Sequence, residues 1–145
     1  MAFQGNQACN VFKTGLMDGT FNFSATTSQV FKIALYTNLA TLNADTTAYT
    51  TDGEVAGSGY VAGGNALTIN LNPTNTNNVT YLSFGNAEWP TATFTARGAL
   101  IYKYDGVTNP AICVLDFGSD KTVSNQTFTV QFPSPTNTSA IIRII

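Results

Sequence analysis

The sequence has 145 residues, which is the size of one ordinary domain, so two full domains are not expected. Only 10% of the residues are charged, the formal net charge is -2, and the few Lys and Arg residues are scattered, so we expect no binding to nucleic acid. The chain contains no histidine, which excludes His-based triads and the usual zinc ligand sets.

The first 28 residues differ from the rest, and we expect them to form an N-terminal arm with a short helix. The apolar residues that fall near one side of this helix are Val11, Phe12, Leu16 and Met17. The helix is predicted over about 8–18, with Gly19 as its stop. The preceding residues are rich in Gln and Asn around a single Phe3. They are expected to be a disordered tail or an arm that orders on a neighbouring subunit.

From residue 29 onward apolar residues recur with period two, which predicts strands that bury one face. The strands are expected at 29–36, 66–71, 79–84, 93–104, 111–117, 127–132 and 139–145, with 59–62 as a weaker candidate. The turn residues Asp105 and Gly106 predict a hairpin between the fourth and fifth of them. The pattern predicts an all-β fold over 29–145, an antiparallel two-sheet sandwich with jelly-roll-like or immunoglobulin-like topology.

A polar, Thr-rich loop over 38–54 follows the first strand. A loop of this length inside a compact domain is usually functional or ordered by a partner. Asn43, Asp45, Asp52 and Glu54 offer oxygen atoms of the kind that bind calcium. Their spacing does not match a twelve-residue calcium loop, and turn formation explains the composition equally well. We therefore expect no metal site.

Three carboxylates and one arginine are the remaining candidates for polar chemistry. Paired carboxylates cleave glycosidic bonds, and Glu88, Asp116 and Asp120 are available for this role. We favour a turn at 116–120 whose carboxylates accept backbone hydrogen bonds. Arg97 lies in an apolar strand and needs an ionic partner, for which Asp116 is the candidate if the two strands are neighbours. This structural pairing is favoured over a substrate clamp.

Aromatic residues suggest a sugar-binding platform, although core packing is the default at strand spacing. The platform would consist of Trp89 with Tyr81, Phe84, Tyr102 and Tyr104. Cys9 and Cys113 lie far apart in sequence and form no C-x-x-C motif, so free thiols are expected. We predict no catalytic, cofactor-binding or metal-binding residues, and a protein that is not an enzyme.

The C-terminal strand is apolar at Ile141, Ile142, Ile144 and Ile145, and Arg143 is its one polar break. Both faces of this strand are therefore apolar. We expect the core to cover one face and something else to cover the other. The beginning of the sequence lacks the basic and apolar regions of a signal peptide, and no apolar run is long enough to span a bilayer, so we expect no membrane partner.

A series of short motifs runs along the chain. In order they are FKIALYT at 31–37, DTTAY at 45–49, EV at 54–55, GSGYVAGG at 57–64, ARGALIY at 96–102, VLDFGSDK at 114–121, FTVQFP at 128–133 and AIIRI at 140–144. These motifs resemble, in the same order, a family of small virion structural proteins of tailed bacteriophages, from about Val11 to the C-terminus. The resemblance implies a non-enzymatic virion component with a jelly-roll-like sandwich. The assignment that we favour is a capsid cement or decoration protein.

This assignment implies a protein that is assembled in the host cytoplasm and located in the virion capsid. Its expected partners are the major capsid protein and further copies of itself, in a dimer or a trimer. The charge-poor surface fits this role, because a high net charge would repel neighbouring copies. The N-terminal segment and the 38–54 loop are expected to reach neighbouring subunits. The alternative is a tail, adaptor or fibre-base component that can bind a host glycan.

Overall fold

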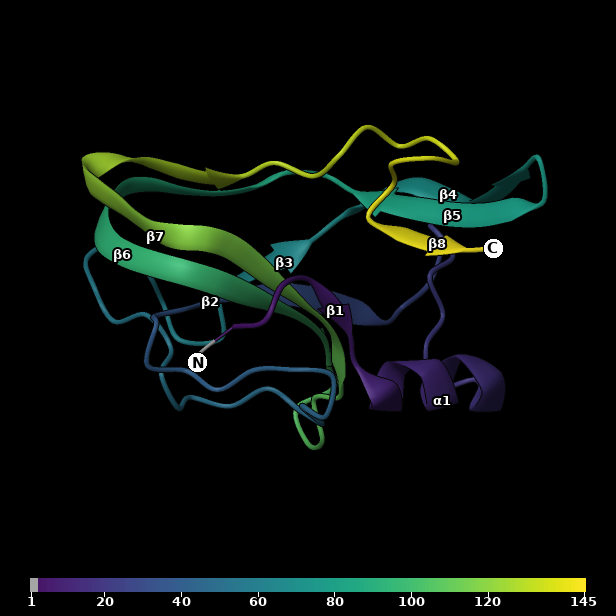
Figure 1. The fold of residues 1–145 in the computed structure, drawn as a ribbon, viewed down its shortest axis with the longest axis horizontal. Coiled ribbons are helices and arrows are strands. Elements are labelled where there is room, and N and C mark those ends of the chain that lie inside the picture. Colours follow the sequence, from purple (N-terminus) through teal and green to yellow (C-terminus); the bar gives the residue numbers. More distant parts are fainter. Residues whose placement is uncertain (1–2) are drawn as a thin grey trace.

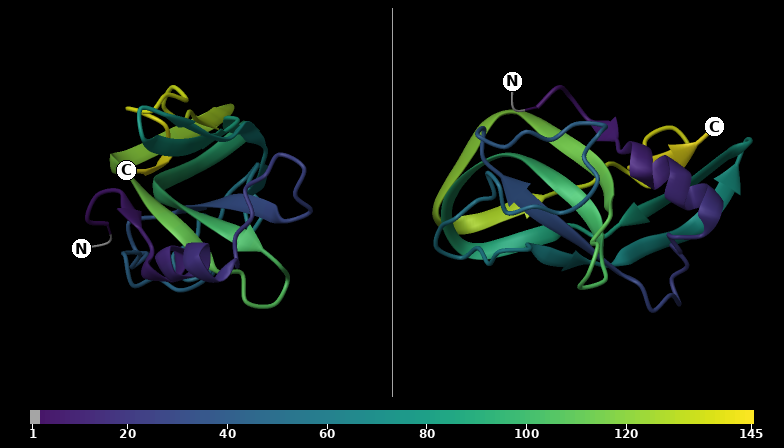
Figure 2. Two further views of the ribbon diagram at one scale, coloured as in Figure 1. Left: turned by 90° about the vertical axis from the view of Figure 1, so that its right-hand side faces the viewer. Right: turned by 90° about the horizontal axis from the view of Figure 1, so that it is seen from below.

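The computed structural model describes residues 3–145 and consists of two antiparallel β-sheets and one short helix (Figures 1 and 2). The elements are β1 (Gln7–Ala8), α1 (Asn10–Asp18), β2 (Val30–Tyr36), β3 (Asn65–Leu67), β4 (Ile69–Thr76), β5 (Val79–Phe84), β6 (Ala87–Tyr104), β7 (Ala111–Val130) and β8 (Ile142–Ile144). The strand orders are β1-β7-β6-β2-β3 and β4-β5-β8. The predicted all-β, two-sheet fold with a short N-terminal helix is confirmed.

The β6–β7 hairpin is the longest pairing of the fold. It runs from Tyr102 opposite Ala111 to Ala87 opposite Val130, which confirms the predicted hairpin and extends it. Register shifts interrupt the ladder between Trp89 and the middle of β6. Because bulges bend and twist a strand, the hairpin curves over at one end, as Figure 1 shows on its left side. The two ends of one hairpin thus lie in different layers.

Strand β7 replaces two predicted strands. We expected strands at 111–117 and 127–132 and a turn at 116–120, and this division is wrong. Gly118 has a φ of 80° and Asn125 a φ of 53°, and both lie inside the continuous strand. These positive φ values mark irregularities that bend the strand without ending it.

The segment predicted as one strand at 66–71 instead supplies two strands. β3 pairs with β2, whereas β4 pairs with β5, so the chain crosses between the sheets at Thr68. Pro73 lies inside β4, an edge strand, where proline is tolerated because it need not donate to the ladder. The β4–β5 turn is formed by Asn77 and Asn78, with φ values of 53° and 65°.

Aromatic side chains fill much of the core between the layers. Phe23 stacks on Phe31 with 4.7 Å between the ring centroids, and Phe12 meets Phe21 edge-on at 5.3 Å. Because each such pair is worth about 0.5–1.5 kcal/mol beyond its buried area, these contacts hold the helix and the following segment to the sheets.

Helix α1 begins later than predicted and ends where the sequence indicates. Gly19 has a φ of 83°, and the N–H of Thr20 donates to the carbonyl of Gly15 at 2.9 Å. Phe12 is buried, but Met17 is 94% exposed, so Met17 does not belong to the apolar side that we expected. No helix in the range 3–145 has the length and apolar character needed to cross a membrane.

The segment before the helix packs on its own sheet. Gln7 and Ala8 pair with Val114 and Cys113 of β7, and Phe3 is buried. The expectation of a disordered tail, or of an arm ordered by a neighbour, is therefore wrong for residues 3–8, and Met1 and Ala2 lie outside the described residues. The edge of β7 supplies backbone partners, and the core supplies a place for the ring of Phe3. The described part of the predicted 1–28 arm thus packs with the 29–145 sandwich.

Candidate functional site

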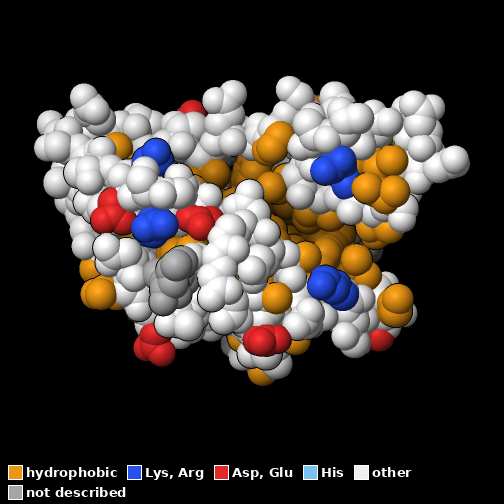
Figure 3. Space-filling view, viewed as in Figure 1, with side chains coloured by type: hydrophobic (Ala, Val, Ile, Leu, Met, Phe, Trp, Pro, Cys, Tyr) orange, Lys and Arg blue, Asp and Glu red, His pale blue; other side chains and the backbone are white. Residues whose placement is uncertain are grey.

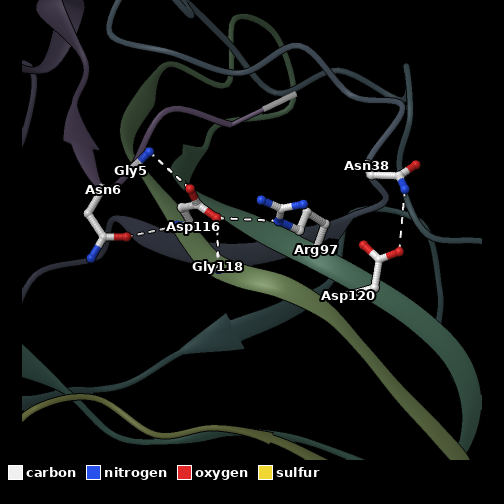
Figure 4. A network of polar contacts seen from close by, with 7 residues as sticks. All are labelled: Gly5, Asn6, Asn38, Arg97, Asp116, Gly118 and Asp120. Atoms are coloured by element: carbon white, nitrogen blue, oxygen red, sulfur yellow. Dashed lines mark hydrogen bonds and ion pairs between the residues drawn. The ribbon is translucent and has the colours of Figure 1, made fainter. Parts of the chain in front are cut away.

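Arg97 and Asp116 form an ion pair across the β6–β7 ladder. Gly98 lies directly opposite Asp116, and the Arg97 Nε atom is 3.5 Å from Asp116 Oδ1 (Figure 4). The two side chains are only 27% and 12% exposed, so the arginine has the partner that its apolar strand requires. The predicted pairing is confirmed.

Asp116 also joins the N-terminal segment to β7. Its Oδ2 accepts a hydrogen bond from the N–H of Gly5 at 2.9 Å, and its own N–H donates to Asn6 Oδ1 at 2.7 Å (Figure 4). Its Oδ1 accepts from the N–H of Gly118 at 2.8 Å. The Gly118 bond, with help from Gly5 and Arg97, holds the pKa of this carboxyl below its usual value. Asp116 accepts backbone hydrogen bonds as expected, but in a bulged strand and not in a turn.

The other two candidate carboxylates have separate positions. Asp120 Oδ2 accepts a hydrogen bond from Asn38 Nδ2 at 3.3 Å, which joins the start of the long loop to β7 (Figure 4). Glu88 lies opposite Thr129, near the other end of the hairpin from Asp116. The ladder therefore does not bring Glu88 and Asp116 together as a pair.

Glu54 is the centre of a second polar network, which the sequence did not reveal. Its Oε1 accepts from the Tyr49 hydroxyl at 2.9 Å, and its Oε2 accepts from the Tyr60 hydroxyl at 3.0 Å and from the N–H of Gly63 at 2.9 Å. The Tyr60 hydroxyl in turn accepts from the N–H of Leu35 in β2 at 2.9 Å. Glu54 thereby fastens the long loop, and the turn that follows it, to the five-stranded sheet.

Further tyrosines complete this attachment. The Tyr36 hydroxyl donates to the carbonyl of Thr50, and the Tyr102 hydroxyl donates to that of Gly63, both at 2.7 Å. Burial raises the pKa of Tyr49 to about 12, with the Glu54 hydrogen bond as the second cause. The phenols therefore remain protonated donors at neutral pH. The loop is ordered by its own domain, so the expectation that a partner orders it is wrong.

The acidic residues of the loop have structural contacts. Asp45 Oδ1 accepts from Asn10 Nδ2 at 2.9 Å, and Asn43 Oδ1 accepts from the N–H of Asp45 at 2.8 Å. Glu54 is engaged by the tyrosines. Within residues 3–145 there is no group of three or more His, Cys, Asp or Glu residues placed to hold a metal ion.

The aromatic residues proposed as a sugar platform lie mostly in the core. Trp89, Phe84 and Tyr102 are each at most 2% exposed, and the Trp89 ring packs against Phe128. Tyr104 is 45% exposed, but the ammonium group of Lys32 lies 4.3 Å from its ring centroid. Core packing is confirmed for the three buried residues, so they offer no surface to a glycan.

Both cysteines are buried free thiols, as expected. Ala8, and not Cys9, lies directly opposite Cys113 in the β1–β7 pairing. Burial raises the pKa of Cys9 to about 11 and that of Cys113 to about 12. The reactive thiolate is therefore scarce at neutral pH.

No protein-family model matches the chain, and comparisons with curated proteins and with solved structures found no significant similarity.

Proposed function

We propose that the protein is a non-enzymatic structural component of a tailed-bacteriophage virion, which binds the capsid shell and stabilises it. Two lines of evidence support this proposal. The first is the ordered series of motifs that resembles small virion proteins. The second is the use that the fold makes of its few charged side chains.

The observation that carries the proposal is the fastening of two surface segments, the N-terminal residues and the 38–54 loop, by partly buried carboxylates. Asp116, paired with Arg97, holds residues 5–6 to β7, and Glu54 holds the long loop to β2. Ordering backbone costs about 1–2 kcal/mol per residue. Because these segments are already ordered, their docking on another protein carries little of this entropic cost. A preorganised surface of this kind suits a protein that holds shell subunits together.

The charge-poor surface supports the same role. β4 exposes mainly Asn and Thr side chains, and the distal part of β7 exposes a polar stretch around Asn125. Such a surface binds through neutral hydrogen bonds and apolar contacts, which salt does not screen as it screens exposed charge pairs. We therefore expect shell binding to depend little on ionic strength.

Reconstitution tests the proposal. Purified protein would be mixed with capsids that lack it, and occupancy and resistance to heat would be measured at low and at high salt. We expect saturable binding at both salt concentrations and a shell that survives higher temperature. Absence of binding to shells, together with binding to tails or to the host envelope, would contradict the proposal and favour the tail or fibre-base alternative.

A further inference from the structure

An apolar groove opens between α1 and the three-stranded sheet, on the face drawn in Figure 3, where hydrophobic side chains line a hollow in the right half of the view. Its volume is about 560 Å³, and its apolar lining includes Phe12, Leu16, Phe23, Leu82, Ile142 and Ile144. A smaller hollow of about 250 Å³ shares Phe12 and Ile142 with it. Among residues 3–145, no charged residue lines the groove, and Arg143 is the one charged residue that lines the smaller hollow.

Strand β8 forms one side of this groove and is an edge strand. It pairs with β5 through Ile142, Arg143 and Ile144, and the sheet order gives it no second neighbour within the described residues. Ile144 is 54% exposed, and Ile145, which follows it, is 92% exposed. We expected something other than the core to cover the second apolar face of the C-terminal strand. Residues 3–145 of the same chain do not supply this cover.

The opposite edge of the same sheet is protected. β4 carries Pro73, and every residue of its second half is exposed and is Asn, Pro or Thr. Proline and polar residues discourage the pairing of an edge with another strand. β8 has no such protection apart from Arg143, and it adjoins an apolar groove. This contrast marks β8 as the edge that is available for pairing.

We propose that a second copy of this chain binds at the edge beside the groove, with the two β8 strands paired antiparallel about a two-fold axis. Ile144 lines the groove, and Ile145 follows it at the same exposed edge. A two-fold axis brings the same patch of both copies together, so each copy supplies what the other lacks. Pairing of β8 with β8 also satisfies the free backbone groups of both edges and makes one six-stranded sheet.

The side chains select one register. If the axis passes through Ile144, the two Ile144 residues lie opposite each other, and Arg143 of each copy lies opposite Ile145 of the other. The arginines then do not face each other, which avoids a repulsive cross-strand pair. Each Ile144 extends the apolar wall of the other copy's groove, and each Ile145 packs along the aliphatic stem of an arginine. The low net charge of the chain, -2, adds little repulsion between copies.

The mass of the protein in solution tests this interface without any capsid, so its outcome is independent of the proposed function. The chain mass is 15.4 kDa, and light scattering is expected to give twice this value for the unmodified protein. The double variant Ile144→Asp, Ile145→Asp should fall to the single-chain mass. Val107→Asp is the matched control, because Val107 is 86% exposed at the β6–β7 tip and does not line the groove. A monomeric or trimeric unmodified protein, or a double variant that stays dimeric, would overturn the proposal.

Disulfide trapping tests the register directly and does not require a destabilising change. Directly opposite Cα atoms in an antiparallel pair are about 4.5–5.5 Å apart, which lies within the range that a disulfide spans. Ile144→Cys is therefore expected to form a covalent dimer under mild oxidation, whereas Val107→Cys should not. The native cysteines are both buried and give little background. Equal crosslinking of the two variants, or none for Ile144→Cys, would contradict the register.

Discussion

The ring of Phe3 covers Gly98 so closely that a β-carbon on Gly98 would overlap it and would also lie 2.5 Å from the carbonyl oxygen of Leu115. This contact places the beginning of the chain over the middle of the β6–β7 hairpin. Gly98 is thus the position that lets the N-terminal segment dock.

Gly98→Ala is expected to detach the N-terminal segment and to lower the free energy of unfolding by about 1–3 kcal/mol, the usual cost of overpacking. Hydrogen exchange would report the detachment at the Cys9 amide, which donates to the carbonyl of Ile112 at 2.9 Å in the native fold. Gly85→Ala is the matched control, because among the described residues a β-carbon there meets only one atom beyond its chain neighbours within 4 Å, at 3.9 Å. Unchanged protection of Cys9 in Gly98→Ala would contradict the packing described.

Asp116 is expected to make the stability depend on pH in the acid range. Its pKa is lowered in the folded state from 3.8, chiefly by the Gly118 hydrogen bond, so its stabilising contribution is present above the unfolded pKa. That contribution is lost as the pH falls from about 4 through the lower folded pKa. Asp116→Asn should therefore be less stable than the unmodified protein at pH 7 and nearly equal to it at very low pH. Urea unfolding at several pH values would measure this, with the exposed Asp52→Asn as control. An equal deficit at all pH values would show that the charge of Asp116 is not the cause.

The Glu54 network predicts an order of severity among tyrosine variants. Tyr49→Phe removes one hydrogen bond from a half-buried position and should cost about 1 kcal/mol. Tyr60→Phe removes two, and it leaves the buried N–H of Leu35 without its partner, so its cost should reach about 2–3 kcal/mol. Thermal or urea unfolding of the two variants gives the comparison. The reverse order would mean that the Leu35 amide finds another acceptor.

The two thiols are expected to be inert in the folded protein. Because burial raises the pKa of Cys9 to about 11 and that of Cys113 to about 12, an aromatic disulfide reagent at pH 8 should label neither cysteine until the protein is unfolded. Cys9→Ala and Cys113→Ala should fold, with a modest loss of stability for each. Rapid labelling of native protein would contradict the burial of the thiols.

Period-two alternation was enough to predict the central hairpin. The Arg97–Asp116 pair could be predicted as well, because an arginine in an apolar strand needs an ionic partner. The continuous β7 could not be predicted. Gly118 and Asn125 are typical turn residues, and only the partner strand shows that the ladder continues past them. The change of sheet at Thr68 arises because β3 pairs with β2 whereas β4 pairs with β5. Tertiary contacts, and not the local sequence, decide these pairings.

The polar sites were predicted only in part, for a similar reason. The docking of Phe3 depends on a glycine 95 positions away in the sequence, and no local pattern signals it. Glu54 was considered as a calcium ligand, whereas its partners are tyrosines and a backbone amide brought together by the fold. The burial of Trp89 follows from its place on the inner face of a strand that continues further than the sequence suggested.

The copy number of the protein in purified virions tests the central claim most directly. Quantitative mass spectrometry would give its ratio to the major capsid protein, with a known tail protein as the internal reference. A shell-stabilising protein is expected in hundreds of copies per particle, in a fixed ratio to the capsid subunits. A value of a few to some dozens of copies, matching the tail reference, would contradict the capsid assignment.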